Sequence, residues 1–423
     1  MSTRGLGPSA THAARIAQIE DAQPADRQGS NALSIPQLLR HHRVPSVSVA
    51  VVDDFDVAWT KSWGVADAQS GKSATDQTLY QAASITKPLA AMASLRAAQL
   101  GLFDLDQDIN SILTSWTLPD TPFGGGVAVT PRMLLSHTSG LGDGFGFPGY
   151  EPGEAMPTLL QMLDGRSPSP LPAVRPARPA MTAYQYSGGG VEIQRLALTD
   201  TVGAAFTRIM DDWVLQPIGM TSSTFEQPLP CELEHRAARA HDNEGARMAA
   251  PWRVYPELAA AGLWTTPGDL AKFVSELQRT LAGRSSLVVD RTMMRDMITP
   301  VGVGPFAVGF VVSQKGDGRY FEHDGDNWGF KAQLIGHVAK GYGAVIMTNG
   351  DNGQAVIDEV QNRIAISYGW DNSTKRPTPT TPDSLDRQRA ARSRSAIRVR
   401  SDSAAAVSVQ GGVSASRSER GTS

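Results

Sequence analysis

The sequence predicts a two-lobed α/β fold of the α+β kind, in which an antiparallel β-sheet flanked by helices carries an inserted, mostly helical lobe. Two observations lead to this prediction. Runs of β-branched and aromatic residues lie near both ends of the chain, whereas helical patterns separated by loops rich in Pro and Gly fill about residues 84–287. We expect the two β clusters to share one sheet, with a ligand cleft between the sheet and the helical lobe.

The N-terminal β cluster consists of residues 46–52 and 57–64, two short runs with an acidic turn between them. The first run reads Ser-Val-Ser-Val-Ala-Val-Val, and two such runs joined by a turn predict a hairpin. In the helical segment the clearest patterns cover residues 88–100 and 203–214. The hairpin is therefore expected to contribute two strands to the sheet, and the two patterns to be helices of the inserted lobe.

The C-terminal β cluster contains four short runs separated by Gly and Asp turns, namely residues 306–313, 319–323, 328–338 and 343–348. This succession predicts an antiparallel meander. Residues 355–367 follow, with four apolar side chains at helical spacing. That apolar stripe predicts a helix that packs on the sheet.

The composition excludes several classes of protein. The chain has 423 residues, of which 41% are hydrophobic and 19% charged, enough for one large core or two modest ones. The 39 Lys and Arg against 42 Asp and Glu give a net charge of -3, so we expect neither a nucleic acid nor a membrane as partner. The single cysteine, Cys231, excludes an intrachain disulfide. No metal or cofactor motif is present, because no His-x-x-x-His pair occurs and the glycines at 124–126 lack the lysine of a nucleotide loop.

The two ends of the chain differ from its middle. Residues 1–30 contain no apolar run long enough for a signal peptide, so we expect a flexible segment there and a cytoplasmic protein. Regular patterning over residues 31–370 predicts the folded domain. Residues 371–423 are rich in Ser, Arg, Ala, Thr and Pro, which predicts a disordered tail. Its Arg-rich part, residues 387–400, is expected to be solvated and to have no function of its own.

The first group of candidate chemical residues is Ser84 with Lys87. On a helix a spacing of three places the hydroxyl and the amine on one face, and the positive helix N-terminus favours a nearby negative charge. A serine nucleophile needs both. The same pattern also occurs by chance, and its ordinary interpretation is a capping serine beside a solvated lysine.

The second group surrounds Tyr186, which is followed by Ser187 and three glycines. We expect a loop here in which the backbone comes close to a substrate. The Tyr186 phenol can share a proton with Lys87, since desolvation of the ammonium and a neighbouring positive charge bring their pKa values toward neutrality, and the two groups would titrate as a unit. An isolated tyrosine in a loop would more often be a packing residue.

The third group is His323, Gly325 and Asp326, at the end of the expected strand 319–323. An edge strand that ends in glycine admits a substrate carbonyl. Its backbone amides, together with the amide of Ser84, would form an oxyanion hole, worth about 3–4 kcal/mol per donor. On its own His323 would be a bystander.

In this order the patterns Ser-x-x-Lys, Tyr-x-Gly and His-x-Gly resemble the serine β-lactamase-related hydrolases, which include class C β-lactamases, penicillin-binding proteins, S12 peptidases and family VIII esterases. The stretches 130–141, 216–221 and 261–267 resemble the same family, and the resemblance covers about residues 33–368. It implies a β-lactamase/transpeptidase-like fold and no cofactor. It also implies an acyl-enzyme on Ser84, with Lys87 and Tyr186 relaying the proton and His323 standing where lactamases carry lysine. Two residues of the first stretch, His137 and Ser139, are assigned structural roles.

Two departures from the family pattern narrow the expected substrate. Gly188 stands where lactamases and peptidases have asparagine, and His323-Asp324-Gly325 replaces Lys-Thr-Gly. A neutral histidine anchors a carboxylate less strongly than lysine, so we expect hydrolysis of a small ester or amide with weak β-lactamase activity at most. The alternatives are a D-stereospecific peptidase or amidase, an acyltransferase, and a sensor or binding protein with little turnover. The oligomeric state is left open.

Overall fold

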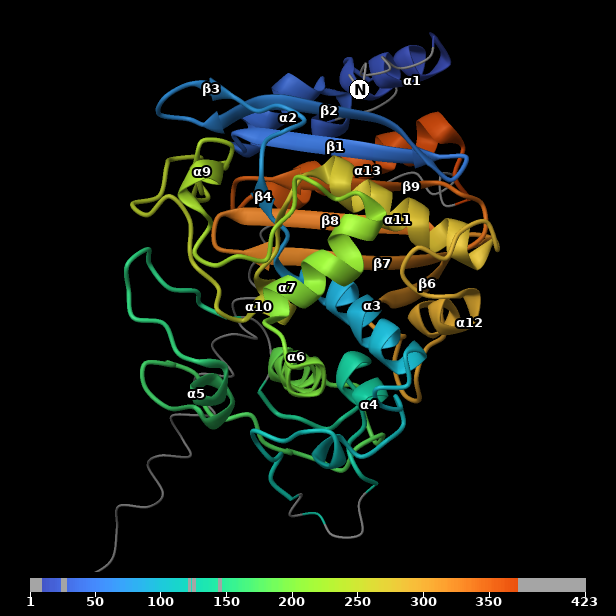
Figure 1. The fold of residues 1–423 in the computed structure, drawn as a ribbon. Coiled ribbons are helices and arrows are strands. Elements are labelled where there is room, and N and C mark those ends of the chain that lie inside the picture. The colour runs from blue at the N-terminus through green and yellow to red at the C-terminus, as the bar shows by residue number, and fades with distance from the viewer. Residues whose placement is uncertain (1–9, 24–28, 121–122, 124–126, 144–146, 372–423) are drawn as a thin grey trace, which may run out of the picture.

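The computed structural model describes residues 10–23, 29–120, 123, 127–143 and 147–371 (Figure 1). Its centre is a seven-stranded sheet with the order β3-β2-β1-β9-β8-β7-β6, in which every neighbouring pair is antiparallel. The strands are β1 Ser46–Asp53, β2 Asp56–Asp67, β3 Lys72–Ser73, β6 Val311–Lys315, β7 Gly318–Asn327, β8 Phe330–His337 and β9 Gly343–Thr348. Because β1 pairs with β9, the N-terminal hairpin and the C-terminal meander form one sheet, as the sequence predicted.

Strand β1 explains why its sequence is apolar at almost every position. It lies between β2 and β9, with Val47 opposite Trp63 on one side and Thr348 on the other. Side chains of successive residues point to opposite faces of a sheet, and both faces are covered here. Val49 packs in the core on one face, and Ala50 packs in the core on the other.

One face of the sheet is covered by three helices, α1 Ala10–Glu20, α2 Ile35–His42 and α13 Gly353–Tyr368 (Figure 1). The hydroxyl of Ser34 caps α2 by accepting from the amide of Gln37, whose side chain accepts from the Ser34 amide in return. Residues 1–30 were expected to be flexible, but α1 lies within them and buries Ile16 and Ile19 against this layer. The expected tail, residues 371–423, lies outside the described residues except for Asp371.

The other face is covered by α11 Pro267–Leu281 and by the helical lobe. We expected α11 to belong to the inserted lobe of residues 84–287. It packs instead on β1, β2, β8 and β9, because one side of it is apolar and buries Phe273 and Val274 in the core beneath the sheet.

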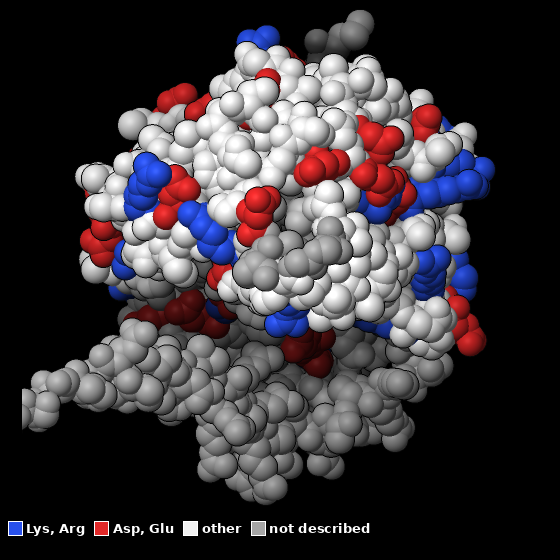
Figure 2. Space-filling view, turned by 90° about the horizontal axis from the view of Figure 1, so that it is seen from below, with Lys and Arg blue, Asp and Glu red and all other residues white. Residues whose placement is uncertain are grey.

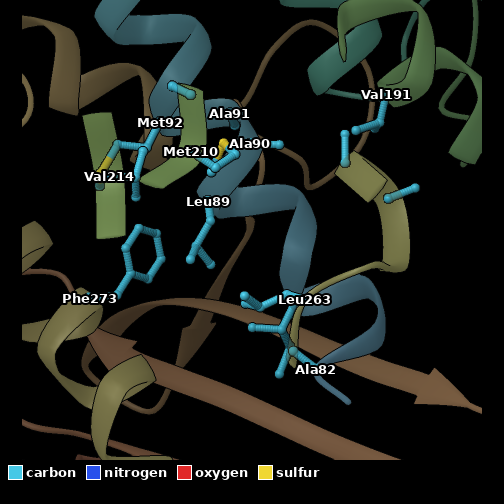
Figure 3. Close-up of a cluster of buried hydrophobic side chains, with 14 of the residues drawn as sticks. Ala82, Leu89, Ala90, Ala91, Met92, Val191, Met210, Val214, Leu263 and Phe273 are labelled. Atoms are coloured by element: carbon cyan, nitrogen blue, oxygen red, sulfur yellow. The ribbon is translucent and has the colours of Figure 1, made fainter. Parts of the chain in front are cut away.

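The helical lobe is built around α3 Thr86–Gln99, which is buried on nearly all sides. Figure 3 shows its side chains, including Leu89 and Met92, among those of Met210, Val214 and Phe273. Apart from α11, the other described α-helices between α3 and β6 are α4 Pro131–Leu135, α5 Leu159–Asp164, α6 Gly188–Val202, α7 Phe206–Met210, α8 Gln216–Ile218, α9 Cys231–Glu234, α10 Leu258–Ala261 and α12 Arg291–Met294. A helix held from all sides is a rigid support for groups at its N-terminus.

Shorter elements complete the described part of the fold. Strand β4 Tyr80–Gln81 pairs with β5 Trp264–Thr265, and a π-helical turn, Asp211–Leu215, continues α7. The 3₁₀ turns are η1 Gly29–Ala32, η2 Ala83–Ile85, η3 Ile109–Ser111 and η5 Arg295–Ile298. Because β4 leads into η2 and η2 leads into α3, the chain passes from the sheet side to the helical lobe at this point.

Candidate active site

Ser84 lies in the turn η2, immediately before α3, and is half-buried. The residue before it, Ala83, has a φ of 48°, a left-handed conformation that costs a non-glycine residue about 1–3 kcal/mol. Strand β7 packs against this turn so closely that a Cβ at Gly325 would lie 2.2 Å from the carbonyl oxygen of Ala82. The contact explains why glycine is needed at position 325 and what holds the turn in place.

Lys87 lies one helical turn after Ser84, and its side chain is buried within the lobe at 2% exposure. Its Nζ is 2.9 Å from Ser84 Oγ and 2.8 Å from the carbonyl oxygen of Ala260. Burial lowers the pKa of Lys87 to about 7, although the negative charges of Glu192, Asp324 and Asp143 act in the opposite direction. A substantial fraction of Lys87 is therefore a neutral amine at neutral pH.

Tyr186 lies on the other side of the same serine. Its hydroxyl is hydrogen-bonded to Ser84, and its ring lies 5.0 Å from the Lys87 Nζ. Burial raises the pKa of Tyr186 above its usual value, so the phenol keeps its proton at neutral pH. The structure thus brings together the three residues that the sequence patterns selected, with a neutral phenol and a readily deprotonated amine on one hydroxyl.

His137 supports Tyr186. The two rings stack with their centroids 4.2 Å apart, and the Nδ1 atom of His137 accepts a hydrogen bond from the amide of Ser187 at 3.2 Å. Burial holds the pKa of His137 well below its usual value, so the ring is neutral. These contacts agree with the structural role expected for His137. Ser139 is also buried, and its hydroxyl has no partner within the described part of the chain.

The glycines after Tyr186 do not form the expected loop. Gly188, Gly189 and Gly190 are the first turn of α6, and the hydroxyl of Ser187 caps this helix by accepting from the amide of Gly190 at 2.8 Å. A Cβ at Gly188 would lie 2.6 Å from the ring of Phe147. Packing against neighbouring side chains, more than backbone freedom, requires the glycine, and the aromatic ring occupies the space beside it.

The sequence predicted that His323 ends its strand. In the structure His323 lies within β7, which continues to Asn327. Strand β7 is also not the edge strand, because β6 lies outside it. However, β6 pairs only with residues 318–322 of β7, so residues 323–327 have no strand on that side in the described part of the chain and pack against η2. The imidazole of His323 is 3% exposed, and burial lowers its pKa to about 4. Its Nδ1 lies 2.7 Å from the carbonyl oxygen of Asp324, and its Nε2 is buried without a partner among the described residues.

The predicted oxyanion residues separate along β7 because side chains alternate between the two faces of a strand. His323 and Gly325 are buried on the side of Ser84, whereas Asp326 is on the opposite face, 70% exposed and paired with Lys331. Only the backbone amide of Asp326 is therefore a candidate for the oxyanion hole. A groove of about 700 Å³ opens at this part of β7 and reaches α13, lined by Glu322, Asp324, Asp326, Asp351 and Asp358 among others.

Sequence reasoning missed the residues that hold Lys87 from the other side. The Oε1 atom of Glu192 accepts from the amides of Ala259 and Ala260, both at 2.9 Å. The Ala260 carbonyl then accepts from Lys87. Glu192 is the one charged residue among the buried positions of α6, and an acidic residue among mostly small and apolar positions is the signal that would have identified it.

The profile of the Beta-lactamase family matches residues 18–366, and the chain belongs to this family. Among curated relatives, the chain is 24% identical over 369 residues to Unguisins hydrolase ungD of Aspergillus violaceofuscus, covering 78% of this chain and 62% of that protein. It is 28% identical over 216 residues to Esterase EstB of Burkholderia gladioli, covering 49% of this chain and 53% of that protein. The chain thus spans a little over half the length of these two relatives.

Solved structures share the fold. The octameric penicillin-binding protein homologue from Pyrococcus abyssi superimposes with a TM-score of 0.64 at 21% identity, covering 81% of this chain and 78% of that one. The D-amino acid amidase from Ochrobactrum anthropi SV3, complexed with L-phenylalanine amide, has a TM-score of 0.64 at 20% identity, covering 84% and 99%. Together they confirm the β-lactamase-like architecture expected from the sequence.

Three further observations on the described residues concern surface charge, membrane-spanning helices and metal-binding groups. Figure 2 shows Lys and Arg interspersed with Asp and Glu on the face seen from below. In the described ranges no helix is long and apolar enough to span a bilayer. The same part of the chain contains no group of three or more His, Cys, Asp or Glu arranged to hold a metal ion.

Proposed function

We propose that this protein is a serine hydrolase that forms an acyl-enzyme on Ser84 and hydrolyses a small ester or amide. The observation that carries the proposal is the contact of 2.9 Å between the Ser84 hydroxyl and a buried lysine amine whose pKa is lowered to about 7. A serine hydroxyl is a weak nucleophile unless a base within hydrogen-bond reach takes its proton.

In the proposed acylation step, neutral Lys87 accepts the proton of Ser84 while Oγ attacks the substrate carbonyl. Lys87 is the base because its pKa is close to neutrality, whereas that of Tyr186 is raised by burial. Tyr186, hydrogen-bonded to the same hydroxyl, then carries the proton from Lys87 to the leaving group as the tetrahedral intermediate breaks down. In deacylation a water molecule takes the place of the leaving group and attacks the acyl-enzyme. The same groups then pass its proton back to the Ser84 oxygen, and the acid is released.

The negative charge of the tetrahedral intermediate needs donors on the opposite side from Lys87. The backbone amides of Ser84 and Asp326 are the proposed donors, since Gly325 brings β7 against the nucleophile turn. The neutral state of His323 adds no positive charge there. This supports a substrate without a carboxylate at that position, in agreement with an ester or amide of modest size.

Two of the similar proteins, an esterase and a D-amino acid amidase, support the same range of substrates. The space beside Gly188 is filled by Phe147, so no side chain at this position reaches the substrate. Lactamases and peptidases use an asparagine there. We therefore propose that β-lactams are poor substrates.

The test is turnover of p-nitrophenyl acetate, p-nitrophenyl butyrate and a D-amino acid amide by the wild type and Ser84→Ala, with acid quenching to trap the acyl-enzyme for intact mass. We expect a single acyl adduct and turnover in the wild type and neither in Ser84→Ala. Turnover that survives in Ser84→Ala would contradict the proposal. An adduct that forms once and is not released would favour the sensor or binding protein.

A further inference from the structure

We propose that Glu192 is a positioning residue for this reaction, which fixes the Ala260 carbonyl against the Lys87 amine and provides the negative charge that this amine faces. The inference rests on the proposed role of Lys87 as the base. Glu192 itself does not contact Ser84 in the hydrogen bonds that the structure gives, so its effect passes through Lys87.

The geometry makes Glu192 a two-sided clamp. One carboxylate oxygen accepts from the adjacent amides of Ala259 and Ala260, at 2.9 Å each. The other accepts from Arg195 at 2.9 Å, and the guanidinium also donates to the carbonyl oxygen of Pro256 at 2.8 Å. Both ends of the segment 256–260 are thus tied to α6, and the Ala260 carbonyl has a fixed place opposite Lys87.

A second buried carboxyl lies beside this clamp but does not share its role. Glu257 is 1% exposed, and its Oε2 has no partner within the described residues. Burial, together with the charge of Glu192, raises the pKa of Glu257 to about 8, so this carboxyl keeps its proton at neutral pH. Glu192, by contrast, accepts hydrogen bonds from two backbone amides and a guanidinium.

The charges around Lys87 come from several elements. Glu192 on α6 is the largest favourable contributor, followed by Asp324 on β7 and Asp143 in the loop after α4. Three further titratable groups among the described residues interact with the amine, namely Tyr186, His137 and His323, and burial keeps all three neutral at pH 7. Of the three carboxylates, Glu192 is the one linked to the amine through a shared hydrogen-bond partner, Ala260.

The experiment measures the rate at which a fluorophosphonate labels Ser84, by intact mass, from pH 5 to 9 in the wild type, Glu192→Gln and Glu192→Asp. The glutamine can still accept from both amides but has no charge, so we expect the acid limb of the rate to move down by about one pH unit. The aspartate keeps the charge but is too short to reach both amides. We expect its acid limb to stay in place and its maximal rate to fall about tenfold or more.

The matched control is Glu276→Gln on α11, because Glu276 is also buried and accepts from a backbone amide, that of Leu287 at 3.0 Å. We expect its labelling rate to follow the wild-type pH dependence. An acid limb in Glu192→Gln that coincides with the wild type would overturn the inference. If Glu192→Gln has no cooperative thermal melt, Glu192→Asp decides, and a wild-type rate in that variant would overturn the inference too. Labelling that persists in Ser84→Ala refutes the proposed function itself, whatever the Glu192 variants do.

Discussion

The two sides of the sheet treat buried charge in different ways. On the α13 side, Arg363 and Glu359 form an ion pair of 2.7 Å, and the guanidinium also donates to the carbonyl oxygens of Ile19 and Leu33. In the helical lobe, the hydrogen bonds of Lys87 to the described residues go only to neutral oxygen atoms, and the carboxylate with the largest effect on its charge, that of Glu192, is linked to it through Ala260. The first arrangement satisfies a charge completely, whereas the second leaves an amine that loses its proton easily.

The difference distinguishes a charge that stabilises the fold, that of Arg363, from an amine suited to catalysis, that of Lys87. Removing one member of a buried ion pair leaves the other uncompensated, so the pair around Arg363 is needed for stability. Burial without a direct counter-ion destabilises the charged form of an amine and lowers its pKa. A general base that works near neutral pH requires such a lowered pKa. We therefore expect substitutions on the two sides to affect different measurements.

The largest effect is expected from Lys87→Met. Loss of the base should lower turnover by about 10²–10⁴-fold, measured with a p-nitrophenyl ester. The same change should raise the melting temperature at pH 6. Because the pKa of Lys87 falls from 10.5 to about 7 on folding, the unfolded chain binds more protons between these values, and the cost to stability is fully present below pH 7. A melting temperature that falls at pH 6 would contradict the assignment of a poorly stabilised amine.

The second-largest effect on activity is expected from Gly325→Ala, which should displace the turn that carries Ser84. A Cβ at this position would meet the Ala82 carbonyl at 2.2 Å, so β7 or η2 must shift. A displacement of about 1 Å can cost about 10²-fold in rate, and we expect a loss of that order in kcat/KM. Unchanged kcat/KM in a folded Gly325→Ala variant would show that the contact does not position Ser84.

Arg363→Met tests the other side of the sheet. Leaving Glu359 buried and unpaired should destabilise the fold by about 3–5 kcal/mol, measured by denaturant unfolding. The rate per folded molecule should not change, because this layer lies across the sheet from Ser84. Glu359→Gln is the milder companion variant, and a selective loss of turnover in either would contradict the separation of the two sides.

The smallest effect is expected from removing residues 386–423. This segment lies outside the described residues and was assigned no function from its composition. Truncation should leave both kcat/KM and the melting temperature at their full-length values. A large loss of activity on truncation would show that the tail contributes to the site or to its partner binding.

The sequence predicted the parts of the molecule that depend on local patterns. Alternation and helical periodicity identified β1, β2, β9 and α13, and the spacing of Ser84 and Lys87 predicted that their side chains meet, as they do at 2.9 Å. Each of these signals needs only a few neighbouring residues, because it follows from the period of one element.

The remaining features depend on contacts between distant segments. The sequence does not show that the glycines after Tyr186 begin a helix, because the ring of Phe147, which leaves no room for a Cβ at Gly188, lies about forty residues away in the chain. The role of Glu192 depends on the amides of a segment more than sixty residues later. The proposed choice of Lys87 over Tyr186 as the base depends on the burial of both side chains, which favours a neutral amine and a neutral phenol, and residue types alone do not show burial.

The most direct test of the account is the rate of fluorophosphonate labelling of the wild type against pH, followed by intact mass, with Ser84→Ala and Lys87→Met measured beside it. We predict one adduct in the wild type, no adduct in Ser84→Ala, and a rate that rises through pH 7 as Lys87 loses its proton. In Lys87→Met this rise should disappear and the rate should stay low at every pH. Labelling that is equally fast in Lys87→Met, or independent of pH in the wild type, would contradict the central claim that the buried Lys87 amine activates Ser84.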